Sequence, residues 1–334
     1  MPQPFRLPSR LARRGALLGA GAVLVVLGLL VWWLVPGGGR TPSGRVTFST
    51  GTHTGVYERY GALLKKELAH DLPDVDVTLR ASQGSGENVR RVATGKADFT
   101  IAAADAVAEY RREHLPGADR LRGCARLYDD YMQLVVPRSS SVKSVADLRG
   151  KRVAVGGRSS GVRLIADRLL SAAGLDINRD ITAVGIGIDA MPGALESGDI
   201  DAFFWSGGLP TTHVRTLSEH FPVRLVELGS LVDRLHQQGG TARYYRAAVM
   251  PADAYPAAQR GQPVTTLAVA NLLVTTDRMS PELTEEVTRT VISSRDRIGA
   301  VVHAAQLVDL RTAIYTDPLP LHEGARRYYR SVKP

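Results

Sequence analysis

Three turns rich in glycine and hydroxyl side chains are the parts of this sequence best suited to bind a ligand. They span residues 49–57 (STGTHTGVY), 81–88 (ASQGSGEN) and 156–161 (GGRSSG). Each follows a predicted strand and precedes a predicted helix. Each would therefore present backbone N–H groups and hydroxyls at a helix N-terminus, which suits a carboxylate or a phosphate. A single such turn is most often a plain helix cap, but three in one chain favour a shared cleft.

The third turn also matches the G-x-S-x-G pattern of a hydrolase nucleophile, at residues 157–161. In that pattern Ser159 would stand on a sharp turn between strand and helix. The acid and histidine of a triad would come from Asp253 or Asp277 and from His303 or His322. Five-residue matches of this kind are common. An enzyme is therefore the weakest interpretation, and we expect no catalytic activity.

Metal and cofactor sites are not indicated by the other motifs. The eight histidines form no H-E-x-x-H pattern and no cluster with the single cysteine, Cys124. Residues 185–190 (GIGIDA) match a dinucleotide-binding pattern. They lie deep in the second half of the chain instead of opening a first βαβ unit, so we interpret them as a turn. We therefore expect no metal, no cofactor and no intramolecular disulfide.

Residues 16–35 contain no charged side chain and follow four arginines within residues 6–14. Twenty helical residues at about 1.5 Å each would span roughly 30 Å, the thickness of a bilayer core. The arginines predict that residues 1–15 stay in the cytoplasm and that the chain beyond a linker at 36–44 lies outside. The apolar run is longer than a typical signal core and ends in a poor cleavage site. A membrane anchor is therefore favoured over a cleaved signal, which stays the alternative.

The charge of the remaining chain argues against nucleic-acid binding. The formal net charge is +9, and five arginines without any acid lie within residues 1–40. The exported part is thus only mildly basic, and its basic residues are not segregated in the sequence. An anionic small molecule would still be compatible with this charge.

From Arg45 onward, short apolar runs alternate with amphipathic stretches, as in predicted strands at 45–50, 75–80 and 131–136 and a predicted helix at 57–70. This alternation predicts an α/β fold built on parallel strands, because each crossover between such strands needs a covering helix.

A break at residues 137–141 and a late long strand at 264–274 suggest two lobes. The first lobe would comprise residues 45–140 and 250–334 with the C-terminal helices, and the second lobe residues 141–249. Two tandem Rossmann-like domains fit the pattern nearly as well.

Five stretches resemble, in the same order, motifs of the TAXI family of solute receptors for TRAP (tripartite ATP-independent periplasmic) transporters. The family's G-T-G-G-V-Y turn is similar to residues 51–57, and its G-S-x-E-N stretch, which runs on to G-x-A-D, is similar to 84–98. The other three correspond to residues 147–156 (DLRGKRVAVG), 198–204 (GDIDAFF) and 320–329 (PLHEGARRYY). The resemblance extends over nearly the whole exported part.

This resemblance implies a two-lobed periplasmic-binding-protein fold of type II. Receptors of the family capture small organic acids, such as glutamate-like molecules or dicarboxylates, and present them to a membrane permease. Closure of the lobes around the ligand would be the working motion. The chain departs from the family at His53 and Thr54, which replace two small glycines, and at Ala103, where the family often has glutamine.

The predicted ligand contacts come from the three turns and from side chains that could line a cleft. An anion held by bidentate hydrogen bonds from Arg158, Arg243 or Arg246 is one hypothesis. The predicted ligand-binding residues are Gly51, Thr52, His53, Gly55, Tyr57, Ser85, Asn88, Asp105, Arg158, Ser159, Ser160, Gly161, Trp205 and Arg246.

We therefore expect an extracytoplasmic receptor, anchored to the cell membrane by its N-terminal helix, that closes on a small organic acid or amino acid for a TRAP-type permease. A membrane-tethered sensing or accessory domain without a transporter is the main alternative. A serine hydrolase using Ser159 is a distant one.

Overall fold

The computed structural model of this chain describes residues 42–53 and 55–332. From Ser43 onward the chain forms one compact unit. The predicted cytoplasmic segment, the predicted membrane helix at 16–35 and most of the linker lie outside the described residues. Within the described residues, no helix is both long enough and apolar enough to cross a bilayer.

The first lobe is built on a mixed sheet whose strands come from both ends of the chain. Its strands are β1 (Gly44–Ser49), β2 (Val75–Arg80), β3 (Phe99–Ala103), β4 (Leu121–Pro137) and β10 (Val264–Thr276). Their order is β2-β1-β3-β10-β4. β1 pairs in parallel with β2 and β3, whereas β10 runs antiparallel to β3 and β4.

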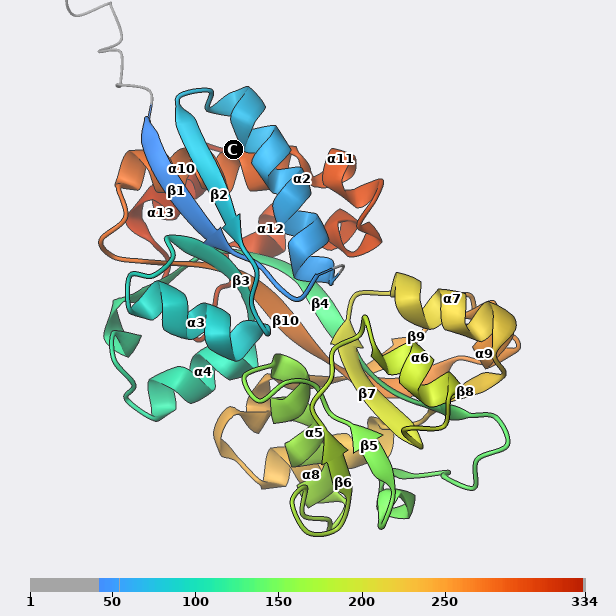
Figure 1. Cartoon of the computed structure of the whole chain (residues 1–334). Helices are drawn as coiled ribbons and strands as arrows, with labels where there is room; N and C mark the ends of the chain where they lie inside the picture. The colour runs from blue at the N-terminus through green and yellow to red at the C-terminus, as the bar shows by residue number, and fades with distance from the viewer. Residues whose placement is uncertain (1–41, 54, 333–334) are drawn as a thin grey trace, which may run out of the picture. The chain divides into compact units, whose positions relative to one another are not determined.

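Helices cover both faces of this sheet. They are α2 (Val56–Asp71), α3 (Ser85–Ala93), α4 (Ala104–Arg112), α10 (Pro281–Ser293), α11 (Arg295–Gly299), α12 (Leu310–Ala313) and α13 (Glu323–Ser331), with 3-10 turns η1 (Ala118–Arg120) and η5 (His303–Leu307). In α2, Tyr60, Leu64 and Leu68 recur every four residues and are buried as one stripe, so this helix packs with one apolar face against the sheet. Figure 1 shows the red C-terminal helices beside the blue N-terminal elements.

The second lobe is a smaller α/β layer. Its strands are β5 (Arg152–Ala154), β6 (Thr182–Val184), β7 (Ala202–Gly207), β8 (Val223–Val226) and β9 (Tyr245–Met250). Its helices are α5 (Gly161–Ala172), α6 (Met191–Glu196), α7 (Thr212–His220), α8 (Val232–Gln237) and α9 (Pro256–Gln259), with 3-10 turns η2 (Val145–Leu148), η3 (Gly229–Leu231) and η4 (Gly240–Tyr244). β5 pairs in parallel with β6 and β7.

β4 and β10 run through both lobes and change partners on the way. β4 pairs with β10 through Asp130 and Tyr131, and from Tyr131 onward it pairs with β7 and then β8. β10 pairs with β9 up to Val269, and with β3 from Asn271 onward. We propose that the lobes meet near Asp130 and Ala268 rather than at the sequence-based boundaries after residues 140 and 249.

The return of β10 to the first sheet settles the architecture. The chain has the two-lobed α/β fold expected from the resemblance, and two tandem Rossmann-like domains are excluded, because a C-terminal strand lies inside the first sheet. Both strands that cross between the lobes are largely buried on both faces, as the near-continuous apolar run of β10 requires. One apolar cluster runs from under α3 and α4 into the second lobe, so the crossing is packed.

Candidate functional site

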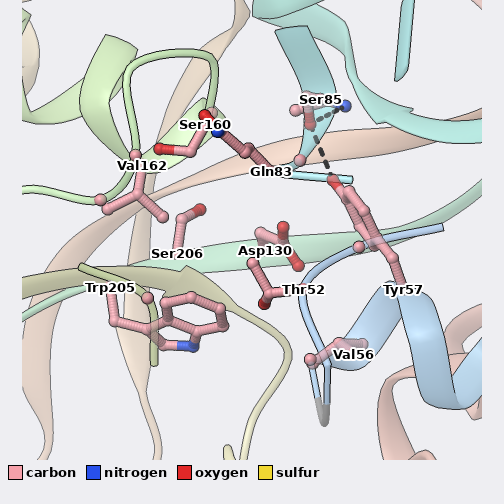
Figure 2. Close-up of a pocket in the computed structure, with 18 of the residues that line it drawn as sticks. Thr52, Val56, Tyr57, Gln83, Ser85, Asp130, Ser160, Val162, Trp205 and Ser206 are labelled. Carbon is pink, nitrogen blue, oxygen red and sulfur yellow. Dashed lines mark hydrogen bonds between the residues drawn. The ribbon is translucent and has the colours of Figure 1, made fainter. Parts of the chain in front are cut away.

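A cavity lies between the two lobes where the three glycine-rich turns converge (Figure 2). Its empty volume is about 660 Å³, including the side that opens to solvent. The first lobe lines it with Gly51, Thr52, Gly55, Val56, Tyr57, Gln83, Gly84, Ser85, Ala103 and Asp130. The second lobe lines it with Gly156, Gly157, Ser160, Gly161, Val162, Ile165, Gly187, Met191, Trp205 and Ser206.

The turns bring the N-termini of α2, α3 and α5 to the cavity. The N-cap residues of α2 and α3 are Gly55 and Gly84, and neither of these helices has a side-chain cap. Gly84 has a φ of +122°, a conformation that side chains disfavour. α5 differs, since the Ser160 hydroxyl accepts a hydrogen bond from the Arg163 amide at 3.2 Å. Uncapped N–H groups at helix N-termini attract negative charge.

A hydrogen-bonded chain fixes the Tyr57 side chain at the cavity wall. The Tyr57 hydroxyl donates to the Asn271 side-chain oxygen and lies 3.0 Å from the Ser85 hydroxyl. Ser85 in turn accepts from the Ala103 amide at 3.1 Å. Burial raises the pKa of Tyr57 well above its ordinary value, so the hydroxyl keeps its proton. Figure 2 shows the link between Tyr57 and Ser85.

Asp130 is the one ionisable carboxyl group among the described residues that line the cavity. The residue is only 5% exposed, and its Oδ1 atom is buried without a hydrogen-bond partner. Burial raises the pKa of Asp130 to about 7, which the nearby Asn271 amide offsets in part without forming a hydrogen bond of good geometry. No Lys, Arg or His is found among the described lining residues.

The lobes touch along the margin of the cavity. The Glu87 amide at the start of α3 donates to the Ser159 carbonyl of the second lobe at 3.3 Å. Close approach here depends on glycine: a Cβ atom on Gly86 would lie 2.8 Å from that carbonyl oxygen. The arrangement is therefore that of closed lobes.

A second contact between the lobes is a polar network around Arg168 of α5. Its guanidinium donates to the Tyr245 hydroxyl at 2.7 Å, to Glu109 of α4 at 2.7 Å, and to the Thr241 hydroxyl. The Tyr245 hydroxyl donates to Asp105 at 2.8 Å. Burial raises the pKa of Asp105, while the bond from Tyr245 and the charge of Arg168 act in the opposite direction.

Replacing Arg168 with Met should destabilise the protein by about 3 kcal/mol, because Glu109 and Asp105 would lose their cationic neighbour. The Arg168 and Glu109 side chains are only 16% and 19% exposed, so water cannot replace the lost bonds fully. Urea unfolding measures the change. Arg163 on the same helix acts on Asp167 through its charge alone, and Arg163→Met should change stability by less than about 0.5 kcal/mol. Equal effects of the two substitutions would contradict this role.

Eight of the predicted ligand-binding residues line the cavity. They are Gly51, Thr52, Gly55, Tyr57, Ser85, Ser160, Gly161 and Trp205. Sequence reasoning missed Asp130, Gln83 and Ser206, which carry no motif. It also interpreted the turn at 185–190 as plain, although Gly187 reaches the cavity.

Three first-lobe residues predicted to bind ligand lie elsewhere. Asn88 is fully buried and bonds to the Thr50 and Ile101 carbonyls, so it holds the first turn in place. Asp105 belongs to the Arg168 network. His53 is exposed and is not part of the cavity wall.

The three arginines considered as an anchor for an anion do not line the cavity. Arg246 is exposed and pairs with Asp129, because its position in β9 directs the side chain away from the cavity. Arg243 stacks on Tyr244, with its guanidinium carbon 4.9 Å from the ring centre. Arg158 lies in a separate groove formed by α3, α4 and α5.

The hydrolase triad is not assembled. Ser159 lines the same groove as Arg158, and among the described residues that groove contains no histidine. His322 accepts a hydrogen bond from the Gly324 amide at the start of α13, and Asp277 pairs with Arg122. These groups belong to the C-terminal part of the first lobe, whereas Ser159 precedes α5 of the second.

Known proteins share this architecture. PhnD1 from Prochlorococcus marinus (MIT 9301), in complex with methylphosphonate, matches with a TM-score of 0.53 and 15% identity, over 78% of this chain and 90% of that one. A putative L-cystine ABC transporter protein from Listeria monocytogenes matches at 0.50 and 17%, over 79% and 98%. An ancestral arginine-binding protein bound to arginine matches at 0.50 and 15%, over 77% and 97%.

These likenesses support the two-lobed periplasmic-binding-protein fold. The sequence itself matches the family model described as NMT1-like over residues 48–332. Because that match spans most of the chain, this protein belongs to the NMT1-like family.

Proposed function

We propose that this protein is an extracytoplasmic solute-binding receptor that closes its two lobes on a small organic acid or amino acid. The observation that carries the proposal is the cavity between the lobes, lined by residues of both and flanked by three helix N-termini. Two proteins of the same fold bind methylphosphonate and arginine, which are small charged solutes.

The anionic group of the solute would bind at the N-termini of α2 and α3. Their first-turn N–H groups have no side-chain cap, and Thr52 and Ser160 add hydroxyls that can donate. Helix N-termini and hydroxyls can hold a carboxylate without an arginine. This proposal replaces the arginine anchor, since Arg158 and Arg246 lie outside the cavity.

The motif resemblance supports a TRAP-type permease as the partner and the type II form of the fold. Residues 16–35 have the length and composition of a membrane anchor, which would keep the receptor at the outer face of the cell membrane. A gene for a large multi-span permease next to this one would support the transport role. A neighbouring kinase gene instead would favour a tethered sensor.

Thermal-shift screening of the purified chain tests the receptor function. The panel contains L-amino acids, 2-hydroxy acids, mono- and dicarboxylates, and small sulfonates and phosphonates. A solute at about 100 times its dissociation constant should stabilise the folded protein by about 2.7 kcal/mol. If no member of the panel raises the melting temperature, the receptor proposal is wrong.

A further inference from the structure

We infer that Asp130 binds a positively charged amino group of the solute, so that the receptor takes molecules with both a cationic and an anionic group. This inference rests on the proposed receptor function and specifies its ligand. The anionic group belongs to the helix N-termini described above, and the cationic group belongs to the carboxylate in the cavity wall.

The position of Asp130 fits this role. It lies where β4 passes from one lobe to the other, and it faces the cavity between Thr52 and Ser206 (Figure 2). The residue is 5% exposed, and Oδ1 has no partner in the described structure. Oδ1 itself is closed to solvent, and the nearby Asn271 amide forms no hydrogen bond of good geometry with the carboxylate. The carboxylate is therefore short of hydrogen bonds, and a cation at the part of Asp130 that lines the cavity would recover much of the cost of burying it.

The charges around Asp130 make a cation the best-suited donor. The charged groups that act on Asp130 are Asp129 and Asp105, and both are acidic. Asp129 is already paired with Arg126 and Arg246, and Asp105 accepts from the Tyr245 hydroxyl. Among the described lining residues, no basic side chain faces Asp130. An ammonium group would therefore meet an unbalanced negative charge.

A neutral hydroxyl of the ligand could also donate to Asp130. A hydroxyl and an ammonium group differ in whether they need a charged carboxylate as their acceptor. Only the ammonium needs the ionised carboxylate, since a hydroxyl can bond equally well to an amide oxygen in its place. Replacing Asp130 with Asn keeps the shape and one acceptor oxygen but removes the charge. The Asn variant therefore separates the two cases.

Matched ligand pairs test the inference by isothermal titration calorimetry. Each pair exchanges an amine for a hydroxyl of similar size: L-glutamate and L-2-hydroxyglutarate, L-aspartate and L-malate, L-alanine and L-lactate, and taurine and isethionate. The wild-type protein should bind the amine of at least one pair about 30-fold more tightly than the corresponding hydroxyl compound. This factor is at the low end of the affinity losses expected when one partner of a buried charge pair is removed.

Asp130→Asn should lose this preference, whereas Asp233→Asn, a change at an exposed acid of α8 that does not line the cavity, should keep it. The inference is overturned if hydroxy acids bind the wild type as tightly as amines, or if Asp130→Asn retains the preference. The wild-type comparison decides the matter even if the variant does not fold. Absence of binding by every compound here and in the thermal-shift panel would instead overturn the receptor function itself.

Discussion

Replacing Gly86 with Leu should abolish solute binding while the unliganded protein stays folded. Gly86 lies in the first turn of α3, and a Cβ atom there would be 2.8 Å from the Ser159 carbonyl oxygen on the opposite lobe. Real Cβ atoms do not approach a backbone oxygen so closely, and Leu adds three more carbons. The side chain would therefore hold the lobes apart. Within α3 itself, Leu forms helix better than Gly by close to 1 kcal/mol.

We expect the affinity for any solute found in the screen to fall by at least about 100-fold, which is about 2.7 kcal/mol of binding free energy. Calorimetry gives the affinity, and small-angle X-ray scattering would show that the solute no longer makes the variant more compact. Gly193 is a matched control: it is an exposed helical glycine, and a Cβ atom added there would meet no other atom within 4 Å. Gly193→Leu should bind like the wild type. A Gly86→Leu protein that binds normally would show that closure does not bring these turns together.

Local patterns in the sequence predicted the elements that surround the cavity. The strand expected at residues 75–80 is β2, and the helix expected at 57–70 is α2 with one residue added at each end. The spacing of apolar residues and the glycine-rich turns depend only on residues that are neighbours in the chain. Both can therefore be recognised in a single sequence. The three turns are also local signals of this kind, and they supply seven of the eight predicted residues that line the cavity.

Features that depend on partners far along the chain were missed. A strand was expected only at 131–136, whereas β4 spans Leu121–Pro137. Arg122, Arg126 and Asp129 interrupt its apolar pattern, and their ion pairs with Asp277 and Arg246 exist only after folding. Asp130 was missed for the same reason, because nothing nearby in the sequence distinguishes it from Asp129. Which of the two faces a cavity depends on the strand's place between the lobes.

The positions of the arginines were not predictable for a related reason. The hypothesis of an arginine anchor rested on the residue type of Arg158, Arg243 and Arg246, but a residue type says nothing about the side to which a strand residue points. Arg246 instead neutralises Asp129 at the surface. In the proposed function the anion is instead held by backbone N–H groups at helix N-termini, which every sequence contains and no composition reveals.

The stability of the unliganded protein should fall as the pH rises from 5 to 8, and Asp130→Asn should remove that part of the fall that Asp130 causes. Burial raises the pKa of Asp130 from 3.8 to about 7. The folded state therefore holds this proton where the unfolded state has lost it, and stability declines between about pH 4 and pH 7. A difference of about three pKa units corresponds to about 4 kcal/mol at most.

The stability of the variant relative to the wild type should increase by about 2–3 kcal/mol from pH 5 to pH 8, because the folded wild type must release the Asp130 proton over this range. Urea unfolding at both pH values gives the comparison. His322, whose pKa burial lowers, acts in the opposite direction over this range, so the difference between the proteins is the quantity to measure. Parallel pH profiles would contradict a buried, unpaired carboxyl at this position.

The same proton connects stability to ligand choice. At pH 8 Asp130 would already be ionised, and an ammonium ligand would offset the cost of burying the Asp130 charge. At pH 5 the carboxyl would first have to release its proton. Affinity for the amine of a matched pair should therefore rise by about 10-fold to 100-fold from pH 5 to pH 8. The upper value follows because pH 5 lies two units below a pKa near 7. Affinity for the hydroxy acid should change little. An amine affinity that falls over this range would mean that Asp130 serves the ligand as a proton donor.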